Sequence, residues 1–228
     1  MIDGRLCVCA SLVREGARLA DIGTDHAYLP VWLAMNGKIK SALACDVREK
    51  PLKSGAENIE KYGCADIVST RLSDGLDKIS PDEADDIVIA GMGAELMTDI
   101  LSRADWVRSP EKRLILQPMT KAFILRKWLC DGGFEILCEI PCTHAGKYYT
   151  VIHTQYSGKK RDFKPYYYYC GELDELDPLS VKYMRSVMRR LLNERKGLIA
   201  KNKDIDAIDS IIYELSRKFG GFDDDNGE

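Results

Sequence analysis

The residues best suited to chemistry lie between Asp21 and Pro30, in the run Asp-Ile-Gly-Thr-Asp-His-Ala-Tyr-Leu-Pro. The apolar residues before Asp21 are typical of a strand, and Gly23 at its end lets a ligand approach the backbone closely. A dinucleotide-binding turn needs further small residues, so that a pyrophosphate can contact bare backbone N–H groups. Asp25 and His26 stand there instead, and a carboxylate repels phosphate. The run therefore favours an adenosine cofactor that carries a cationic amino acid, a description that S-adenosylmethionine fits.

Three acidic residues follow the first three predicted strands. Asp21 closes the first strand, Asp46 closes the second, and Asp74 lies in a glycine-containing loop after the third. An acid about 20 residues beyond a glycine turn is placed to accept hydrogen bonds from ribose hydroxyls, which is the role we predict for Asp46. Asp74 could reach the adenine amino group. Each acid alone is better explained as a helix cap or turn residue, but the three together favour an adenosine site.

A second glycine turn, Ala90-Gly-Met-Gly-Ala94, follows the fourth predicted strand. Its glycines allow close backbone approach, although a tight strand-to-helix turn explains them equally well. Methyltransferases that act on the exocyclic nitrogen of adenine carry an Asn/Asp-Pro-Pro-aromatic motif here, and this chain has none. That motif supplies carbonyl acceptors to free the amine lone pair, whereas ring nitrogen N1 already has an in-plane lone pair.

The elements that must position these residues alternate between strand and helix patterns from Ala17 to about Gln155, as in a parallel α/β sheet. Strands are predicted at 17–22, 40–45, 66–71, 86–90, 113–117, 134–140 and 148–155, and helices at 5–14, 28–36, 51–62, 94–103 and 120–130. The short connection before the last strand predicts an antiparallel hairpin. Seven strands closed in this way are typical of the Rossmann-like class I methyltransferase fold.

The composition changes after Tyr156. A basic joint at 157–161 and four tyrosines at 166–169 precede an acidic turn, and two apolar runs at helical spacing then slip in phase near 201–204. We predict a catalytic domain at 1–157, a linker at 158–177, and at 178–228 a C-terminal α-helical coiled-coil hairpin with an acidic tail from Phe222. The apolar spacing does not decide whether these helices pair within or between chains, so the expected state is a monomer or a weak homodimer.

The charge distribution of the C-terminal region points to nucleic acid. The net charge of −3 argues weakly against such a partner, and a solvated helix face is the usual reason for a charge run. Between Val181 and Lys203, however, Glu194 is the single acid among eight basic residues. These are Lys182, Arg185, Arg189, Arg190, Arg195, Lys196, Lys201 and Lys203. An imbalance of this size is better explained by phosphate contacts.

Composition excludes several other classes. Of the 228 residues 30% are charged and 45% hydrophobic, and no apolar run approaches the roughly 20 residues that cross a bilayer. We therefore expect no membrane partner and, because no secretory signal is visible, a cytoplasmic protein. The eight cysteines lack the spacing of metal ligands, so we expect apolar fillers and no metal site.

Four segments together resemble the bacterial tRNA adenine-22 N1-methyltransferase family. They are the run from Asp21 to Pro30, Ile89-Ala-Gly-Met-Gly93, Arg113-Leu-Ile-Leu-Gln-Pro118 and Gly146-Lys-Tyr148. The resemblance covers about Arg5 to Gln155, and the predicted helical hairpin is similar in pattern to the family's coiled-coil domain. The chain departs from the family at Ala94, Met119 and Asp46, where glycine, asparagine and often glutamate are usual.

The resemblance implies an enzyme that transfers a methyl group from S-adenosylmethionine to N1 of an adenine in tRNA, at position 22. It implies cofactor contacts from Gly23, Asp25, His26, Asp46, Val47, Asp74, Gly75, Leu76, Gly91 and Met92. Asp25 and Met92 would lie beside the transferred methyl group, and Gln117-Pro118 would face the incoming base. Because N1 methylation leaves a cationic ring, Asp25 is our candidate for stabilising the developing charge.

Substrate contacts are predicted on both parts of the chain. The candidates are Tyr28, Gln117, Pro118, Lys147, Tyr148, Arg185, Arg189 and Arg190. Tyr28 or Tyr148 could stack on a displaced adenine, although for Tyr28 we favour a place in the core. His26 also fits an ordinary residue at a helix start, and Gln117 a capping group.

Two rival functions use the same patterns. A nicotinamide-dependent oxidoreductase would have this sheet, but it needs the glycine fingerprint that Asp25 and His26 interrupt. A non-catalytic module that binds an adenosine cofactor and RNA would show the same acids and the same basic helix. Cofactor binding followed by a methyl-transfer assay separates these functions.

Overall fold

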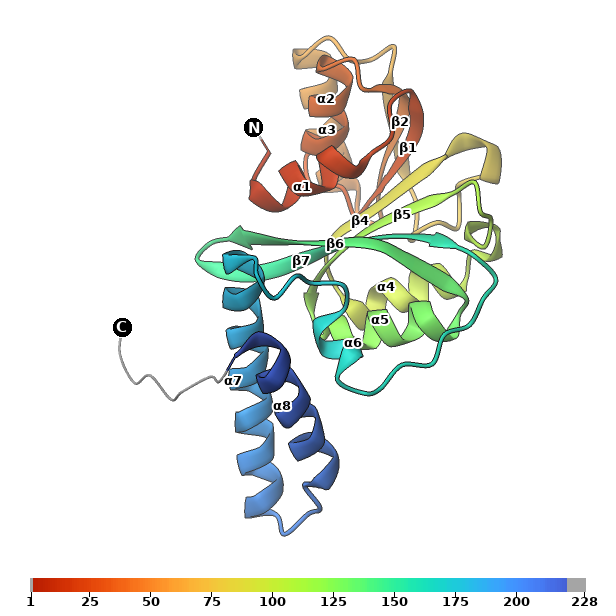
Figure 1. Cartoon of the computed structure of the whole chain (residues 1–228). Coiled ribbons are helices and arrows are strands. Elements are labelled where there is room, and N and C mark those ends of the chain that lie inside the picture. Colours follow the sequence, from red (N-terminus) through yellow and green to blue (C-terminus); the bar gives the residue numbers. More distant parts are fainter. Residues whose placement is uncertain (1, 221–228) are drawn as a thin grey trace.

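The computed structural model describes residues 2–220, so the predicted acidic tail at 222–228 lies outside the described residues. Seven strands form one sheet in the order β3-β2-β1-β4-β5-β7-β6 (Figure 1). The strands are β1 (Ala17–Ile22), β2 (Ile39–Asp46), β3 (Val68–Leu72), β4 (Asp86–Gly93), β5 (Arg113–Thr120), β6 (Phe134–His144) and β7 (Lys147–Tyr156). Strands β1 to β5 pair in parallel, and β7 pairs antiparallel with both β5 and β6. The predicted α/β class, with seven mostly parallel strands and a closing hairpin, is confirmed.

The strand order reverses between β1 and β4. The chain moves outward from β1 through β2 to β3, then returns to place β4 on the other side of β1. In open α/β sheets the crevice beyond the carboxyl ends of the strands at such a switch point is where ligands bind. The turns after Ile22 and Ala90 both lie at this edge, so the fold brings together the two glycine turns that the sequence singled out.

Five helices cover the two faces of the sheet. Helices α1 (Gly4–Leu12), α2 (Tyr28–Met35) and α3 (Glu49–Lys61) lie on one face, and α4 (Ala94–Ser102) and α5 (Ala122–Asp131) lie on the other (Figure 1). Asp3 caps α1 by accepting hydrogen bonds from the backbone N–H groups of Arg5 and Leu6, both at 3.0 Å.

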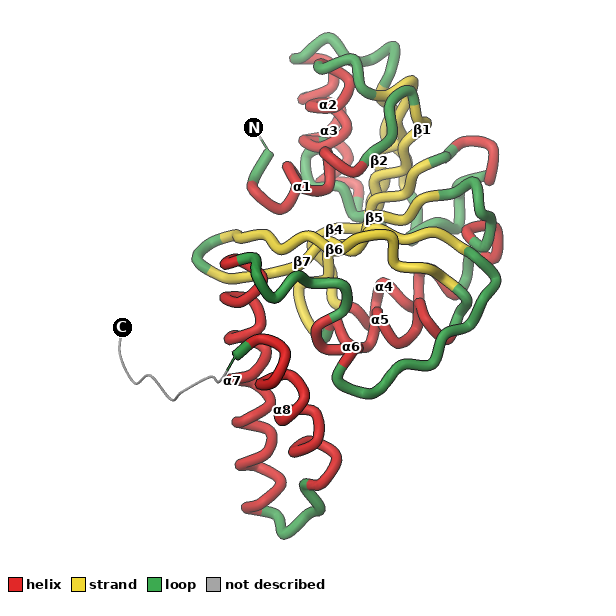
Figure 2. Tube along the Cα trace, viewed as in Figure 1, coloured by secondary structure: helices red, strands yellow, loops and turns green. Residues whose placement is uncertain are grey.

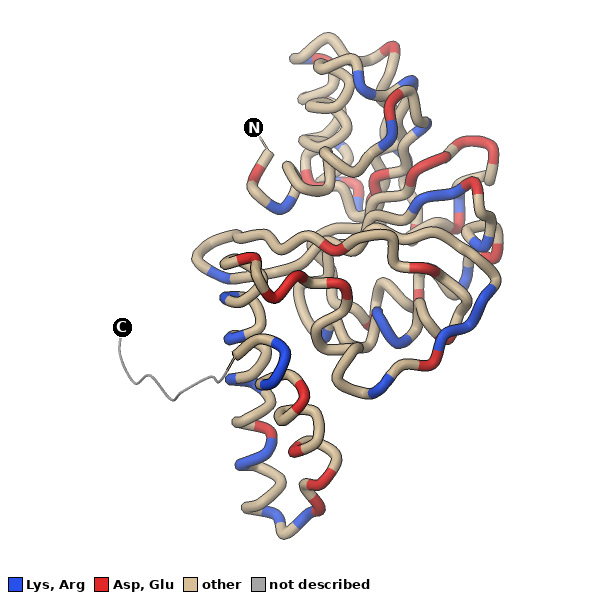
Figure 3. Tube along the Cα trace, in the orientation of Figure 1, with Lys and Arg blue, Asp and Glu red and all other residues tan. Residues whose placement is uncertain are grey.

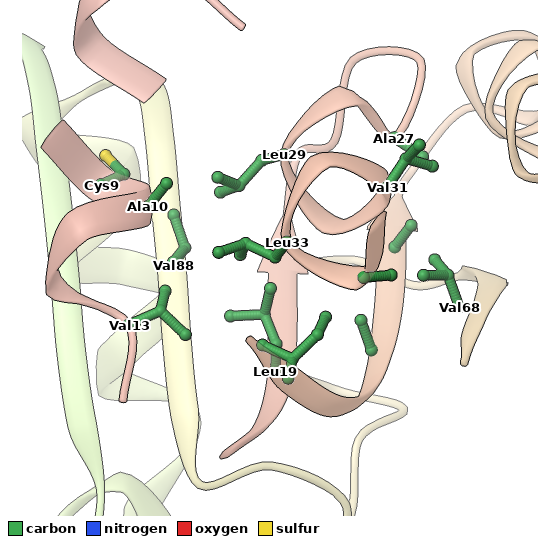
Figure 4. Close-up of a cluster of buried hydrophobic side chains, with 14 of the residues drawn as sticks. Cys9, Ala10, Val13, Leu19, Ala27, Leu29, Val31, Leu33, Val68 and Val88 are labelled. Atoms are coloured by element: carbon green, nitrogen blue, oxygen red, sulfur yellow. The ribbon is translucent and has the colours of Figure 1, made fainter. Parts of the chain in front are cut away.

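Each helical layer encloses its own apolar core. In Figure 4, Leu29 and Leu33 of α2 point toward Cys9 and Ala10 of α1 and toward Val13 just after it. Burying a side chain of this size contributes about 2 kcal/mol, so this contact fixes α1 beside the start of α2. Helix α1 thereby lies next to the switch point.

The C-terminal helices form a separate layer. A short helix α6 (Tyr167–Cys170) precedes α7 (Pro178–Ala200) and α8 (Asp206–Phe219), which run away from the end of the β6–β7 hairpin (Figure 2). Asp177 caps α7 through the backbone N–H of Ser180 at 2.7 Å, and Pro178 occupies the first helical turn. The apolar residues of both predicted runs meet in one core, so α7 and α8 pair within the chain. The sequence did not predict α6.

All eight cysteines are free thiols, and six of them are buried. Within residues 2–220, no group of three or more His, Cys, Asp and Glu side chains is arranged to hold a metal ion. None of the helices in this part of the chain has the length and apolar character needed to span a membrane.

Candidate functional site

A cavity of about 550 Å³ opens at the carboxyl ends of β1 and β4, and we call it the switch-point cleft. Its volume is in the range of small-molecule and cofactor sites. Four of the predicted site residues, Gly23, Asp25, Tyr28 and Gly91, line it. Its other lining residues are Asp3, Arg5, Leu6, Asp21, Thr24, Leu29, Arg48, Ala90 and His144.

Two backbone hydrogen bonds fix the turn after β1 against strand β2. The N–H groups of Gly23 and Thr24 both donate to the carbonyl oxygen of Cys45 in β2, at 2.8 and 2.9 Å. Gly23 has φ +73°, and a Cβ on it would lie 2.0 Å from Cε of Met92. Only glycine combines this backbone conformation with such close packing. The structure therefore brings the side chain of Met92 directly against the first glycine turn.

Asp21 gives the floor of the switch-point cleft its charge. The side chain is 5% exposed, and burial raises the pKa of its carboxyl group to about 6, an effect that the nearby Thr24 hydroxyl partly offsets. No Lys, Arg or His side chain among residues 2–220 forms an ion pair with it. A buried carboxylate without a cationic partner is an unfavourable arrangement that a cationic ligand would relieve. The floor thus suits a positively charged group.

Asp25, His26 and Ala27 form a strained turn. His26 and Ala27 have φ of 59° and 54°, a conformation that costs energy for residues other than glycine and that is enriched at functional sites. Asp25 is 82% exposed, and its carboxylate lies 3.2 Å from Nε2 of His26. The His26 ring stacks on Tyr28 with centroids 5.4 Å apart. The turn therefore presents a carboxylate, an imidazole and a phenol at the mouth of the cleft.

Our placement of Tyr28 in the core was wrong. The side chain is 38% exposed and lines the switch-point cleft. The reason is that α2 begins at Tyr28, so its first residue projects beyond the sheet while Leu29 turns inward. An exposed phenol beside the cleft is available for contact with a base.

Gln117 is fully buried beneath the second glycine turn. Its Oε1 accepts hydrogen bonds from the backbone N–H of Gly91 at 3.1 Å and from Nη1 of Arg5 at 3.2 Å. Its Nε2 donates to the carbonyl oxygen of Pro118 at 3.1 Å. Because both ends of the amide are engaged inside the protein, Gln117 is placed to shape the turn from below.

Helix α1 forms a wall of the cleft that the sequence did not predict. Asp3 accepts a hydrogen bond from Nη2 of Arg5 at 2.7 Å, and it lies 2.9 Å from Nδ1 of His144 at the end of β6. Burial alone would raise the pKa of Asp3, but the hydrogen bonds from Arg5 and Leu6 hold it below its usual value. His144 is far from Asp3 and Arg5 in the sequence, and no local pattern marks it as their neighbour.

The other predicted cofactor residues lie along the same edge of the sheet but do not line the cleft. Asp46 is 7% exposed at the end of β2, where it accepts the backbone N–H of Arg48 at 2.8 Å. Asp74 is paired with Arg103 at 3.0 Å. The remaining residues differ in exposure: Val47 is exposed, Gly75 packs against Ile100, and Leu76 is buried in the core.

A second cavity, of about 720 Å³, lies between the ends of β5 and β7 and the first half of α7, and we call it the basic cleft. Six of the eight predicted substrate residues line it or lie on its rim: Pro118, Lys147, Tyr148, Arg185, Arg189 and Arg190. Its further lining residues are Met119, Thr120, Lys121, Ala122, Gly146, Tyr149, Lys182, Tyr183 and Ser186. Six cations and no acid surround this cavity, so it suits a polyanion.

The two long C-terminal helices differ in charge. Basic residues recur along α7, whereas acidic residues occur along α8 (Figure 3). Arg195, one of the predicted phosphate contacts, pairs instead with Asp209 of α8 at 2.5 Å. The free positive charge is therefore concentrated on the half of α7 that faces the sheet.

Comparison with known proteins agrees with this geometry. A family model described as a methyltransferase domain matches residues 2–152. A Bacillus subtilis protein named tRNA (adenine(22)-N(1))-methyltransferase is 38% identical over 151 residues, which are 66% of this chain and 63% of the relative. The match thus spans less than two thirds of that protein's length.

Solved structures resemble nearly the whole chain. A Streptococcus pneumoniae protein in complex with S-adenosyl-L-methionine, provisionally assigned as a tRNA (m1A22) methyltransferase, has a TM-score of 0.80 at 35% identity. That likeness covers 93% of this chain and 100% of the other. The m1A22 tRNA methyltransferase of B. subtilis has a TM-score of 0.80 at 28% identity, with 96% of each chain covered.

Proposed function

Because this chain belongs to the methyltransferase domain family, we propose that it transfers a methyl group from S-adenosyl-L-methionine to ring nitrogen N1 of an adenine in tRNA. Within that family it groups with the tRNA adenine-22 N1-methyltransferases, and the likeness includes the C-terminal helices. The observation that carries the proposal is the pairing of a cofactor-sized cleft, lined by the buried unpaired carboxylate of Asp21, with a second, basic cleft. The first suits a cationic adenosine compound and the second an RNA backbone.

The residues of the switch-point cleft fit this cofactor. When bound, S-adenosyl-L-methionine supplies an electrophilic methyl group on a positively charged sulfur. Asp21 offers a buried unpaired carboxylate to its cationic part, and Gly23 and Gly91 let it lie against the backbone. Asp46, at the end of the neighbouring strand, remains our candidate for the ribose hydroxyls.

The chain's part in the chemistry is positioning and charge stabilisation. Adenine N1 has a free lone pair, so no residue has to remove a proton before the attack. Asp25 lies at the mouth of the cleft, where its carboxylate can stabilise the positive charge that develops on the base. Tyr28, half-exposed beside it, can stack on a base turned out of the RNA.

The basic cleft would hold the RNA while the switch-point cleft carries out the transfer. Gln117 lies between the two cavities, because it binds Gly91 in one wall and Pro118 in the other. A base that enters the switch-point cleft would therefore leave its phosphates near Lys147, Arg185 and Arg189. We propose that the sheet domain and the α7–α8 hairpin divide the work in this way.

Three measurements on the intact chain test the proposal. Calorimetry with S-adenosyl-L-methionine and with NAD separates a methyltransferase from an oxidoreductase. Transfer of a tritiated methyl group to bulk tRNA then separates an enzyme from a binding module. Cofactor binding without methyl incorporation would favour the module, and binding of NAD alone would refute the methyltransferase.

A further inference from the structure

A buried ion pair joins the sheet to the C-terminal helices. The side chains of Arg126 in α5 and Glu139 in β6 are both 0% exposed, and Nε of Arg126 lies 3.1 Å from each carboxylate oxygen of Glu139. Charges buried in this way are stable only when good geometry and further hydrogen bonds compensate for the lost water. The partners that supply those bonds therefore show what the pair connects.

Arg126 holds two of the C-terminal elements. Its Nη1 donates to the carbonyl oxygens of Tyr168 and Tyr169 in α6, at 2.8 and 3.0 Å, and its Nη2 lies 3.4 Å from the hydroxyl of Tyr183 in α7. A planar guanidinium has donors in fixed directions, so these contacts define an orientation as well as a distance. Phe123 on the same helix adds a stacked contact with Tyr169, with centroids 4.8 Å apart.

Glu139 completes the joint from the sheet side. Its carboxylate accepts a hydrogen bond from Oγ1 of Thr150 in β7 at 2.8 Å and one from the backbone N–H of Glu172 at 3.3 Å. The chain passes so close at Gly171, with φ +57°, that a Cβ there would lie 2.0 Å from Oε2 of Glu139. One ion pair thus binds α5, α6, α7 and both strands of the closing hairpin.

This joint lies directly behind the basic cleft. Tyr183, which contacts Arg126, lines the cleft from α7, and Ala122 at the start of α5 lines its opposite side. Two apolar side chains could fill the same space without the cost of burying charges. What they could not supply is a directional link between the sheet and the helix that carries Lys182, Arg185 and Arg189.

We propose that the Arg126–Glu139 pair is a positioning device that fixes α7 relative to the switch-point cleft, so that RNA held in the basic cleft presents its adenine in line for methyl transfer. The inference rests on the proposed function and adds a requirement to it. The two residues line neither the switch-point cleft nor the basic cleft. Loosening the joint should leave both binding steps intact and misplace the base, and a displacement of about 1 Å is enough to slow a reaction about a hundredfold.

The test compares the wild type with the double variant Arg126→Met/Glu139→Leu, which replaces the pair with apolar groups. We expect an unchanged stoichiometry and affinity for S-adenosyl-L-methionine and an RNA affinity within about threefold, because every cation of the basic cleft remains. We expect kcat with saturating tRNA to fall by about tenfold or more. A merely structural role would instead lower the fraction of molecules that bind the cofactor, and it would lower kcat only in that proportion.

A conservative variant and a matched control sharpen the result. In Arg126→Lys one ammonium group faces Glu139 but cannot also hold both α6 carbonyl groups, so kcat should fall to an intermediate value. The control, Arg71→Met/Glu83→Leu, removes an ion pair with contacts of 2.7 and 2.8 Å at the β3 edge of the sheet and should leave kcat unchanged.

The outcomes separate the two proposals. If either Arg126 variant binds cofactor fully and retains wild-type kcat and KM for tRNA, the positioning role is overturned. If the double variant loses cofactor binding, the kcat of the Arg126→Lys variant tests the positioning role in its place. A wild-type protein that binds cofactor and RNA but transfers no methyl group would instead refute the proposed function.

Discussion

Replacing Asp21 with asparagine should make the protein more stable at neutral pH and weaken its hold on the cofactor. Asp21 is buried at the end of β1, and burial raises the pKa of its carboxyl group from 3.8 to about 6. The folded protein therefore binds this proton more tightly than the unfolded chain does. The contribution of Asp21 to stability is most favourable below pH 3.8 and is lost as the pH rises from 3.8 through about 6.

The size of the effect follows from the shift. A difference of about 2 pKa units corresponds to about 3 kcal/mol of unfolding free energy once the group is ionised. An asparagine removes this cost, but a buried amide without hydrogen-bond partners destabilises the folded protein by about 1–3 kcal/mol. That second contribution does not depend on pH. The stability difference between variant and wild type should therefore shift in favour of the variant by about 2 kcal/mol between about pH 4 and about pH 7.5.

Cofactor binding should respond in the opposite direction. If the Asp21 carboxylate holds the cationic part of S-adenosyl-L-methionine, the wild-type affinity should decrease as the pH is lowered below 6, by up to about tenfold per pH unit. The affinity of the variant should show no such dependence. Urea unfolding and calorimetry at matched pH values measure both effects. A variant that loses stability equally at both pH values, or that keeps wild-type affinity throughout, would refute the reasoning.

Three further substitutions test other parts of the site. Asp25→Asn should keep cofactor affinity within about tenfold while kcat falls about a hundredfold or more, and an unchanged kcat would remove Asp25 from its charge-stabilising role. Gly23→Ala should destabilise the protein by about 1–3 kcal/mol and weaken cofactor binding, because the new Cβ would lie 2.0 Å from Met92 Cε at a φ of +73°. Thermal unfolding and calorimetry that give wild-type values would contradict this expectation. Arg185→Ala/Arg189→Ala should raise KM for tRNA, leave kcat unchanged and reduce the salt dependence of RNA binding by about two phosphate contacts. The control Arg195→Ala should have little effect, because Arg195 pairs with Asp209. Equal losses of RNA affinity in both variants would argue against the basic cleft as the RNA site.

The sequence predicted the elements well because their signals are local. The apolar runs that form β1 to β7, the glycine turns at Gly23 and Gly91, and the phase slip before α8 each lie within a few residues of what they specify. The basic residues of α7 were also predicted to act together, and six predicted substrate residues share one cavity.

What the sequence did not reveal depends on contacts between distant segments. Arg5 reaches Gln117, and Asp3 reaches His144, across more than a hundred residues, and neither pair has a spacing that marks it. The joint between Arg126 and Glu139 was hidden for the same reason, since charged residues in a sequence are expected at the surface. Tyr28 was misplaced because an aromatic residue at a helix start fits either the core or a cleft wall.

The most direct test of the central claim is mass-spectrometric mapping of the modified nucleoside in a tRNA incubated with the protein and S-adenosyl-L-methionine. The account predicts one methyl group on N1 of the adenine at position 22, and none in a transcript with guanine at that position. Methylation of an exocyclic amine, of another position, or of neither transcript would contradict it.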